Sequence, residues 1–140
     1  MAYCASHIID ENDRVVGDYR DGEYLRAISD TRWRTSYCIP AEREVNEAMG
    51  IKNTMMNISS VVFRRRQLSE EFAQTLRAMS VGGDTYLLLN AMRGGKVRFV
   101  ADALNYHRRH RGSIVGKILN ERTEGHLRGF FRDFYSNHVF

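Results

Sequence analysis

The residues best placed for chemistry are Asp84, which follows two glycines, and a basic segment of two histidines and two arginines at 107–110. The glycines allow a sharp turn, and the apolar run that begins at Tyr86 predicts a buried helix starting beside Asp84. A carboxylate there can be an N-cap that accepts backbone N–H bonds, or a general base that faces a cleft. The residues alone leave both roles open.

Two arginine-rich segments suit an anionic ligand. Arg64–Arg66 follow a predicted strand, and Arg108 and Arg109 lie between His107 and His110. Contacts of arginine with phosphate would make the chain a basic nucleic-acid-binding module, although no aromatic residues alternate with the arginines as stacking platforms. The two histidines are three residues apart, which permits a metal site on a helix, but no nearby cysteine or acid completes a ligand set.

Composition indicates one folded domain. The chain has 140 residues, 43% of them hydrophobic, and a net charge of +4, which is enough for a real core and favours an anionic partner. Cys4 and Cys38 are too few for a disulfide framework, so we expect a reducing compartment, the cytoplasm. We find no apolar run as long as a membrane span and no signal-peptide pattern.

The hydrophobic pattern predicts an α/β fold with these elements in order. The expected strands are Tyr3–Ile9, its hairpin partner Arg14–Gly17, Val61–Phe63 and Lys96–Val100. The expected helices are Ala41–Met49, a helix capped by Ser69, the buried helix after Gly83 that Gly94 and Gly95 end, and a last helix capped by Ser113. Irregular structure is expected around Trp33.

Five motifs occur in an order that resembles the second half of a family-two, GT-A-type glycosyltransferase. They are Tyr3-Cys4-x-Ser6-x-Ile8-Ile9-Asp10, Asn57–Arg65, Gly83-Asp84, Gly95-Lys96-Val97 and Tyr106–Ser113. The resemblance implies a small mixed sheet flanked by helices. Residues 1–113 would form the acceptor-side half of the enzyme domain, and residues 114–140 a C-terminal helical extension.

The resemblance also implies roles for single residues. Asp84 would be the general base of an inverting transfer from a nucleotide-diphosphate sugar to a saccharide or lipid-linked acceptor. Asn57, Arg108 and Arg109 would contact substrate, and His110 would approach the metal or the diphosphate. The first half of the family, which holds the nucleotide, has no counterpart here, so we expect a fragment that is inactive alone. The enzyme would act in bacterial cell-surface polysaccharide synthesis, in the cytoplasm or at the inner membrane face.

The family's metal motif is altered in this chain. Its cofactor is a divalent cation, Mn²⁺ or Mg²⁺, held by an Asp-x-Asp pair, and Ala5 stands where the first acid belongs. Alanine offers no oxygen ligand, so His7, two residues on, is the candidate substitute. The missing half would also leave a strand edge unpaired, which predicts self-association. The stripe of Phe130, Phe131 and Phe134 is expected to be core, or else a self-association or membrane-surface patch.

Overall fold

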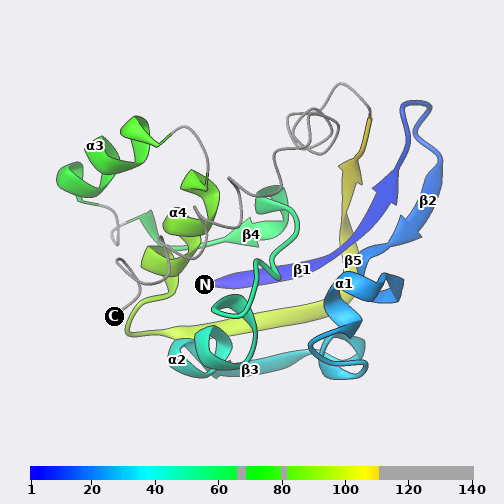
Figure 1. Ribbon diagram of the computed structural model, residues 1–140, viewed down its shortest axis with the longest axis horizontal. Helices are drawn as coiled ribbons and strands as arrows, with labels where there is room; N and C mark the ends of the chain where they lie inside the picture. The colour runs from blue at the N-terminus through cyan, green and yellow to red at the C-terminus, as the bar shows by residue number, and fades with distance from the viewer. Residues whose placement is uncertain (66–68, 80–81, 111–140) are drawn as a thin grey trace.

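A strongly curled mixed sheet organises the chain, as the computed structural model shows for residues 1–65, 69–79 and 82–110 (Figure 1). The strand order is β2-β1-β5-β3, and β4 pairs with β1 outside this path. β1 and β5 are parallel, whereas the other three pairings are antiparallel. The strands are β1 (Ala2–Ile9), β2 (Val15–Asp18), β3 (Tyr37–Pro40), β4 (Val61–Val62) and β5 (Lys96–Arg108). The predicted α/β class and its mixed sheet with antiparallel pairs are therefore confirmed.

The predicted hairpin of β1 and β2 is present, and its turn is held by an aspartate. One carboxylate oxygen of Asp10 accepts the backbone N–H groups of Asn12 and Arg14, at 2.8 and 3.0 Å. Asp13 has a φ of 64°, in the left-handed region that aspartate tolerates better than most residues. The polar run between the two strands thus folds as a tight turn because its own side chains satisfy the backbone.

β5 is much longer than the sequence predicted. The alternation that indicated a strand at Lys96–Val100 continues in the structure to Arg108, so the first residues of the expected basic loop belong to the strand. Its register against β1 shifts between Cys4 and Ala5 and again between Ala5 and Ser6. Such irregularities bend a strand and increase its twist, which accounts for the curl of the sheet.

The segment between β3 and β4 begins as the predicted helix but changes its winding. α2 covers Ala41–Glu44, and Val45–Met49 continue as a π-helical turn. The N–H of Gly50 bonds to the carbonyl oxygen of Val45 at 2.7 Å, and a Cβ at this glycine would lie 2.7 Å from the same oxygen. Gly50 ends the helix as predicted, but it does so because the backbone approaches too closely for a side chain. A short helix, α1 (Glu23–Arg26), precedes β3.

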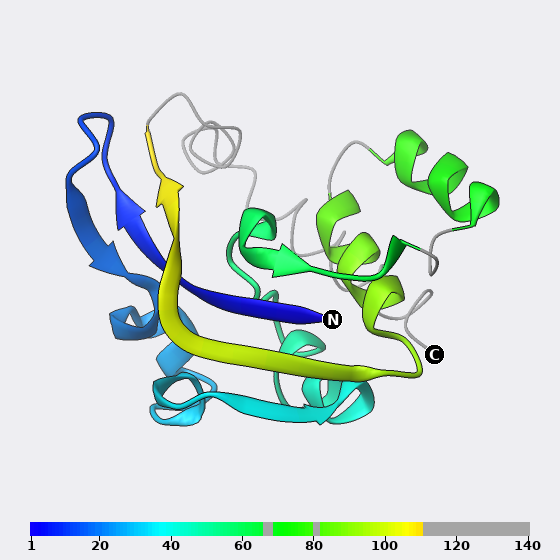
Figure 2. The ribbon, with the colours of Figure 1, turned by 180° about the vertical axis from the view of Figure 1, so that it is seen from behind.

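α3 (Glu70–Ala78) and α4 (Gly83–Met92) lie together beyond β4, at the end of the sheet where β1 begins (Figures 1 and 2). Ser69 caps α3 as predicted, accepting the N–H of Phe72 at 3.1 Å. The ring of Phe72 stacks on Tyr86 of α4, with centroids 4.9 Å apart. Leu88 and Met92 turn into the core, so the apolar run of α4 is buried on one side.

A buried polar network joins β1 to β3 and α2. The carboxylate of Glu44 is fully buried and accepts from Arg32 Nη2 at 2.8 Å, from Tyr37 at 3.1 Å and from Tyr3 at 3.4 Å. Trp33 Nε1 donates to the Tyr3 hydroxyl at 3.1 Å. Burial, and then the charge of Glu44, raises the pKa of Tyr37 to about 12, so its hydroxyl stays protonated and able to donate. The stretch around Trp33, expected to be irregular, is a short 3-10 turn fixed by this network.

Several expectations concern residues that the structure does not describe. The helix capped by Ser113, the phenylalanine stripe at 130–134 and the extension 114–140 lie outside the described residues, as does Arg66. Within the described residues, no helix has the length and apolar character that crossing a membrane requires.

Candidate functional site

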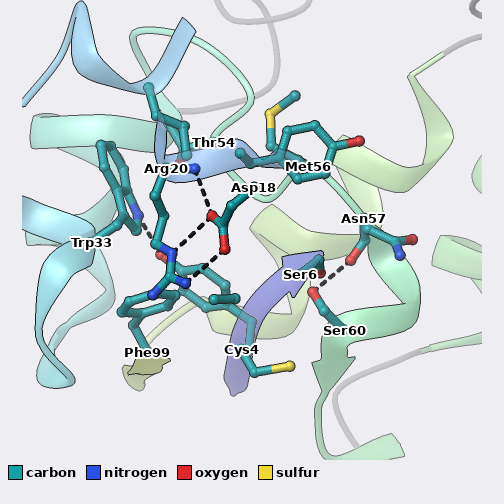
Figure 3. Close-up of a pocket in the computed structure, with 14 residues that line it drawn as sticks. Cys4, Ser6, Asp18, Arg20, Trp33, Thr54, Met56, Asn57, Ser60 and Phe99 are labelled. Carbon is teal, nitrogen blue, oxygen red and sulfur yellow. Dashed lines mark hydrogen bonds and ion pairs between the residues drawn. The ribbon is translucent and has the colours of Figure 1, made fainter. Parts of the chain in front are cut away.

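A pocket opens where two strands part along one edge of β1. β4 pairs with Ala2 and Tyr3 on this edge, and β2 pairs with His7–Ile9. Among the described residues no strand pairs with this edge at Cys4–Ser6, and these three residues line the pocket. Figure 3 shows its two side walls, which carry Asp18 and Arg20 on one side and Asn57 and Ser60 on the other; its lining also includes Trp33, Thr54 and Phe99.

An ion pair at the end of β2 forms the first wall. Arg20 donates two side-chain hydrogen bonds to Asp18, from Nε to Oδ1 at 2.8 Å and from Nη2 to Oδ2 at 2.6 Å. Its remaining terminal nitrogen, Nη1, donates to the carbonyl oxygen of Ala101 at 2.6 Å. Burial acts to raise the pKa of Asp18, but hydrogen bonds and charge from Arg20 outweigh it and lower that pKa. The carboxylate is therefore ionised at neutral pH, and both of its oxygens are already bonded.

The second wall carries small polar side chains. Asn57 accepts the N–H of Ser59 through its side chain at 3.2 Å, and the hydroxyl of Ser60 donates to the carbonyl oxygen of Asn57 at 2.7 Å. Ser6, on the floor, accepts from the side chain of Asn105 at 2.9 Å. The cavity volume is about 30 Å³. One water molecule needs roughly 10–15 Å³, so the pocket has room for two or three waters or one polar substituent of a larger ligand.

The residues around Ala5 and His7 do not fit a divalent cation. Ala5 is buried in the pocket floor and supplies no ligand atom. His7 Nδ1 lies 3.9 Å from Asp18 Oδ2, and Arg20 holds both oxygens of that carboxylate. Within the described residues, no three His, Cys, Asp or Glu side chains are grouped as metal ligands. Mn²⁺ and Mg²⁺ require several oxygen ligands, and the described residues around Ala5 and His7 do not supply them.

The basic residues gather at the ends of the parallel strands β1 and β5. Arg108 donates through Nη1 to the carbonyl oxygen of Asp10 at 2.9 Å and through Nη2 to the carboxylate of Asp13, so it braces the hairpin turn. The guanidinium of Arg109 lies 5.8 Å from the centre of the Tyr19 ring. His110 follows the strand and is exposed. Of these residues, Arg109 and His110 are the better placed to meet an anion.

His107 does not pair with His110 as a metal site on a helix would require. It belongs to β5, where its Nδ1 lies 2.5 Å from the Tyr19 hydroxyl. Burial, and then the charge of Arg109, lowers the pKa of His107. The idea of a helical i, i+3 pair is therefore wrong, because this segment is a strand end.

Asp84 lies in the first turn of α4 and is exposed. The N-cap is Gly82, with a φ of 78°, so of the two roles that the sequence left open for Asp84, that of N-cap is wrong. Its Oδ1 accepts the N–H of Thr85 at 2.8 Å, which leaves Oδ2 without a bond to any described residue. Asp84 does not line the pocket. Of the predicted site residues, all of which are described, only Asn57 lines that cavity, together with Ala5 at the altered position of the metal motif.

Sequence reasoning missed the pair of Asp18 and Arg20. The only local sign was an acid two residues before an arginine at the end of a predicted hairpin strand. Nothing in the sequence indicated that Ala101, far along the chain, would accept from the same guanidinium.

Comparisons of the chain with protein-family models, with curated proteins and with solved structures found no match.

Proposed function

We propose that this chain is the acceptor-side part of an inverting, GT-A-type glycosyltransferase and that it transfers no sugar by itself. The proposal rests on the order of the five motifs, and one structural observation supports it most. The carboxylate of Asp84 is exposed at the start of a helix, with one oxygen held by Thr85 and the other open. A general base needs an oxygen that a substrate hydroxyl can reach.

The proposed chemistry is a single displacement. Asp84 Oδ2 takes the proton of the acceptor hydroxyl while the hydroxyl oxygen forms a bond to the anomeric carbon of the donor. The bond from that carbon to the nucleoside diphosphate breaks, and its electron pair leaves with the phosphate oxygen, so the configuration inverts. The base is needed because an alcohol is a poor nucleophile until its proton is being removed.

Asn57 and the arginines would contribute binding. Asn57 lines the pocket and is half-buried, and its amide nitrogen would donate to a sugar hydroxyl while its side-chain oxygen accepts the N–H of Ser59. Arg109 would neutralise diphosphate charge, and Arg108 could do so only after releasing Asp10 and Asp13.

The small pocket supports the second half of the proposal. A cavity of about 30 Å³ cannot enclose a nucleotide sugar. This pocket is therefore not a donor site, and the proposal assigns donor binding to another part of the enzyme. Positioning two reactants supplies on the order of 7–11 kcal/mol of barrier reduction. A lone general base supplies only about 10²- to 10⁴-fold in rate. Asp84 therefore cannot compensate for a missing donor site.

Sugar transfer and amide chemical-shift mapping test the proposal. We expect no transfer by the isolated chain from any nucleotide sugar. A nucleoside diphosphate should shift the amides of Arg109 and His110, with no further effect of Mn²⁺.

In the complete enzyme, Asp84→Asn should lower turnover by at least about 10²-fold and spare donor binding. The matched control is Glu71→Gln, which removes the charge of an exposed acid in the first turn of α3. Transfer by the isolated chain that Asp84→Asn abolishes would contradict the proposal.

Duplex DNA in the same mapping tests the alternative. A nucleic-acid-binding module would show salt-dependent shifts at Arg64, Arg65 and Arg109 together. β4, which leads to Arg64 and Arg65, runs away from the end of β5 that carries Arg109 (Figures 1 and 2). A nucleic acid would therefore have to contact these arginines at two separate places.

A further inference from the structure

No described strand pairs with the outer edge of β5 over its second half. One edge of β5 pairs with β1 as far as Arg108, but the other pairs with β3 only at Lys96–Phe99. Just beyond, Ala101 is satisfied by side chains, its N–H by Ser36 and its carbonyl by Arg20. From Asp102 to Arg108, no described strand covers this edge. Unpaired edges are templates for another strand.

The backbone of this segment is oriented to pair. The N–H of Arg109 bonds to the carbonyl oxygen of Ile9 in β1, at 2.9 Å. Backbone groups of successive residues in a strand point to alternate edges, so those of Arg108 and Tyr106 point away from β1, toward the open edge. Among the described strands, the other outer edges of the sheet are short: those on β2 and β3 are four residues long and that on β4 is two, and Pro40 interrupts the edge of β3.

The exposed side chains of the segment form a self-complementary order. Leu104 and Tyr106 are 70% and 60% exposed, large values for apolar groups in the middle of a strand. Asp102 lies two residues before Leu104, and Arg108 two residues after Tyr106; both are exposed. Read along the exposed face, the order is acid, apolar, apolar, base.

We propose that this edge pairs with the same edge of a second copy of the chain, in antiparallel register about a two-fold axis at Asn105. Asp102 of one copy then lies opposite Arg108 of the other, and Leu104 opposite Tyr106, each pair occurring twice. Opposite charges and aromatic–aliphatic pairs directly across antiparallel strands stabilise a sheet, and an isologous interface makes such contacts reciprocal. Arg108 already bonds to Asp10 and Asp13, so the charge pair sets the register more than it adds affinity.

The oligomeric state of the 140-residue chain is the first test. Sedimentation should show a monomer–dimer equilibrium that depends on concentration. Leu104→Lys, which changes two contacts in each dimer, should raise the dissociation constant by about tenfold or more. The matched control, Val62→Lys, alters an equally exposed apolar residue on β4 and should leave the constant unchanged. A strict monomer, or a dimer indifferent to Leu104→Lys, would overturn the proposal.

The register has its own tests. Asp102→Lys should weaken the dimer by placing like charges opposite each other, and adding Arg108→Glu in the same chain should restore it. In a chain with Cys4 and Cys38 replaced by serine, Asn105→Cys should form an interchain disulfide, because directly opposed residues lie within disulfide reach.

Ala103→Cys is the control for the cross-link. In the proposed register the two introduced sulfurs would be separated by four residues along the strand, about 14 Å, and should not join. Equal cross-linking through positions 103 and 105, or failure of the charge swap to restore the dimer, would contradict the register.

Discussion

Two carboxylates, Glu44 under the sheet and Asp84 at the start of α4, show how the same group is used in opposite ways. Glu44 is fully buried, and both of its oxygens accept hydrogen bonds, including one from Arg32 at 2.8 Å. Asp84 is exposed and bonds only through Oδ1 within the described structure, to Thr85. A carboxylate with both oxygens hydrogen-bonded in the core holds the fold together, whereas one with an oxygen that no described residue binds can still take part in chemistry.

The surroundings of the two groups follow the same division. Around Glu44, side chains from β1, β3 and α2 converge, so a change there disturbs several elements at once. Around Asp84, the helix starts at Gly82 and the carboxylate is not needed as a cap. The comparison predicts that replacing Glu44 lowers the free energy of unfolding by a large amount. Replacing Asp84 should impair function and change the free energy of unfolding only slightly.

The largest effect is expected from Glu44→Ala. It leaves the Arg32 guanidinium, 14% exposed, without its buried partner and removes the acceptor of two tyrosine hydroxyls. Breaking a buried ion pair costs about 3–5 kcal/mol, so we expect a loss of this size in the free energy of unfolding, measured by urea denaturation.

The matched control for this prediction is Glu47→Ala. Glu47 also bonds to Arg32, at 2.8 Å, but its side chain is 41% exposed, so water replaces it. A loss at Glu47 as large as that at Glu44 would show that burial does not separate the two carboxylates, and the comparison would fail.

A smaller, pH-dependent effect is expected at His107. Burial, and then Arg109, lowers its folded-state pKa below the unfolded value of about 6.5. The unfolded chain therefore binds the proton more readily, and the stability that neutral His107 contributes is present above about pH 6.5 and lost as the pH falls through the folded pKa. Urea unfolding at a series of pH values should show this loss, and His107→Gln should reduce it.

The control for the pH profile is His110→Gln, which removes an exposed imidazole from the same strand end. If the two substitutions flattened the profile equally, the loss could not be assigned to the contact between His107 and Tyr19.

The elements with a strong local pattern could be predicted from the sequence. The apolar β1, the turn at Asp10, the cap at Ser69 and the stop at Gly94, with its φ of 65°, are all confirmed. Each depends on side chains that satisfy or constrain the backbone within a few residues. Local chemistry of this kind can be read from neighbouring positions.

Features that depend on distant contacts could not be predicted. Glu44 accepts hydrogen bonds from Tyr3 and Tyr37, which lie far from it or on another element. Nothing in the neighbouring sequence distinguishes Glu44 from the other acids of its helix. The second half of β5 contains aspartate, alanine and asparagine, which are depleted in strands, but pairing with β1 overrides this preference. Likewise aspartate is a common N-cap, so the sequence left that role open for Asp84, whereas the N-cap of α4 is Gly82 because the backbone there is left-handed.

The smallest effect is expected from Asp84→Asn in the isolated chain. Asparagine keeps an oxygen that can accept the N–H of Thr85, so the bond measured at 2.8 Å can persist. What is lost is a negative charge in the first turn of α4, worth about 0.3–1 kcal/mol at an exposed position. We therefore expect the free energy of unfolding to fall by less than about 1 kcal/mol. Asp84→Ala, which removes the acceptor as well, is the companion variant and should cost more. A loss from Asp84→Asn as large as that from Glu44→Ala would make Asp84 a structural carboxylate. In that case any fall in turnover on its replacement would no longer identify a base.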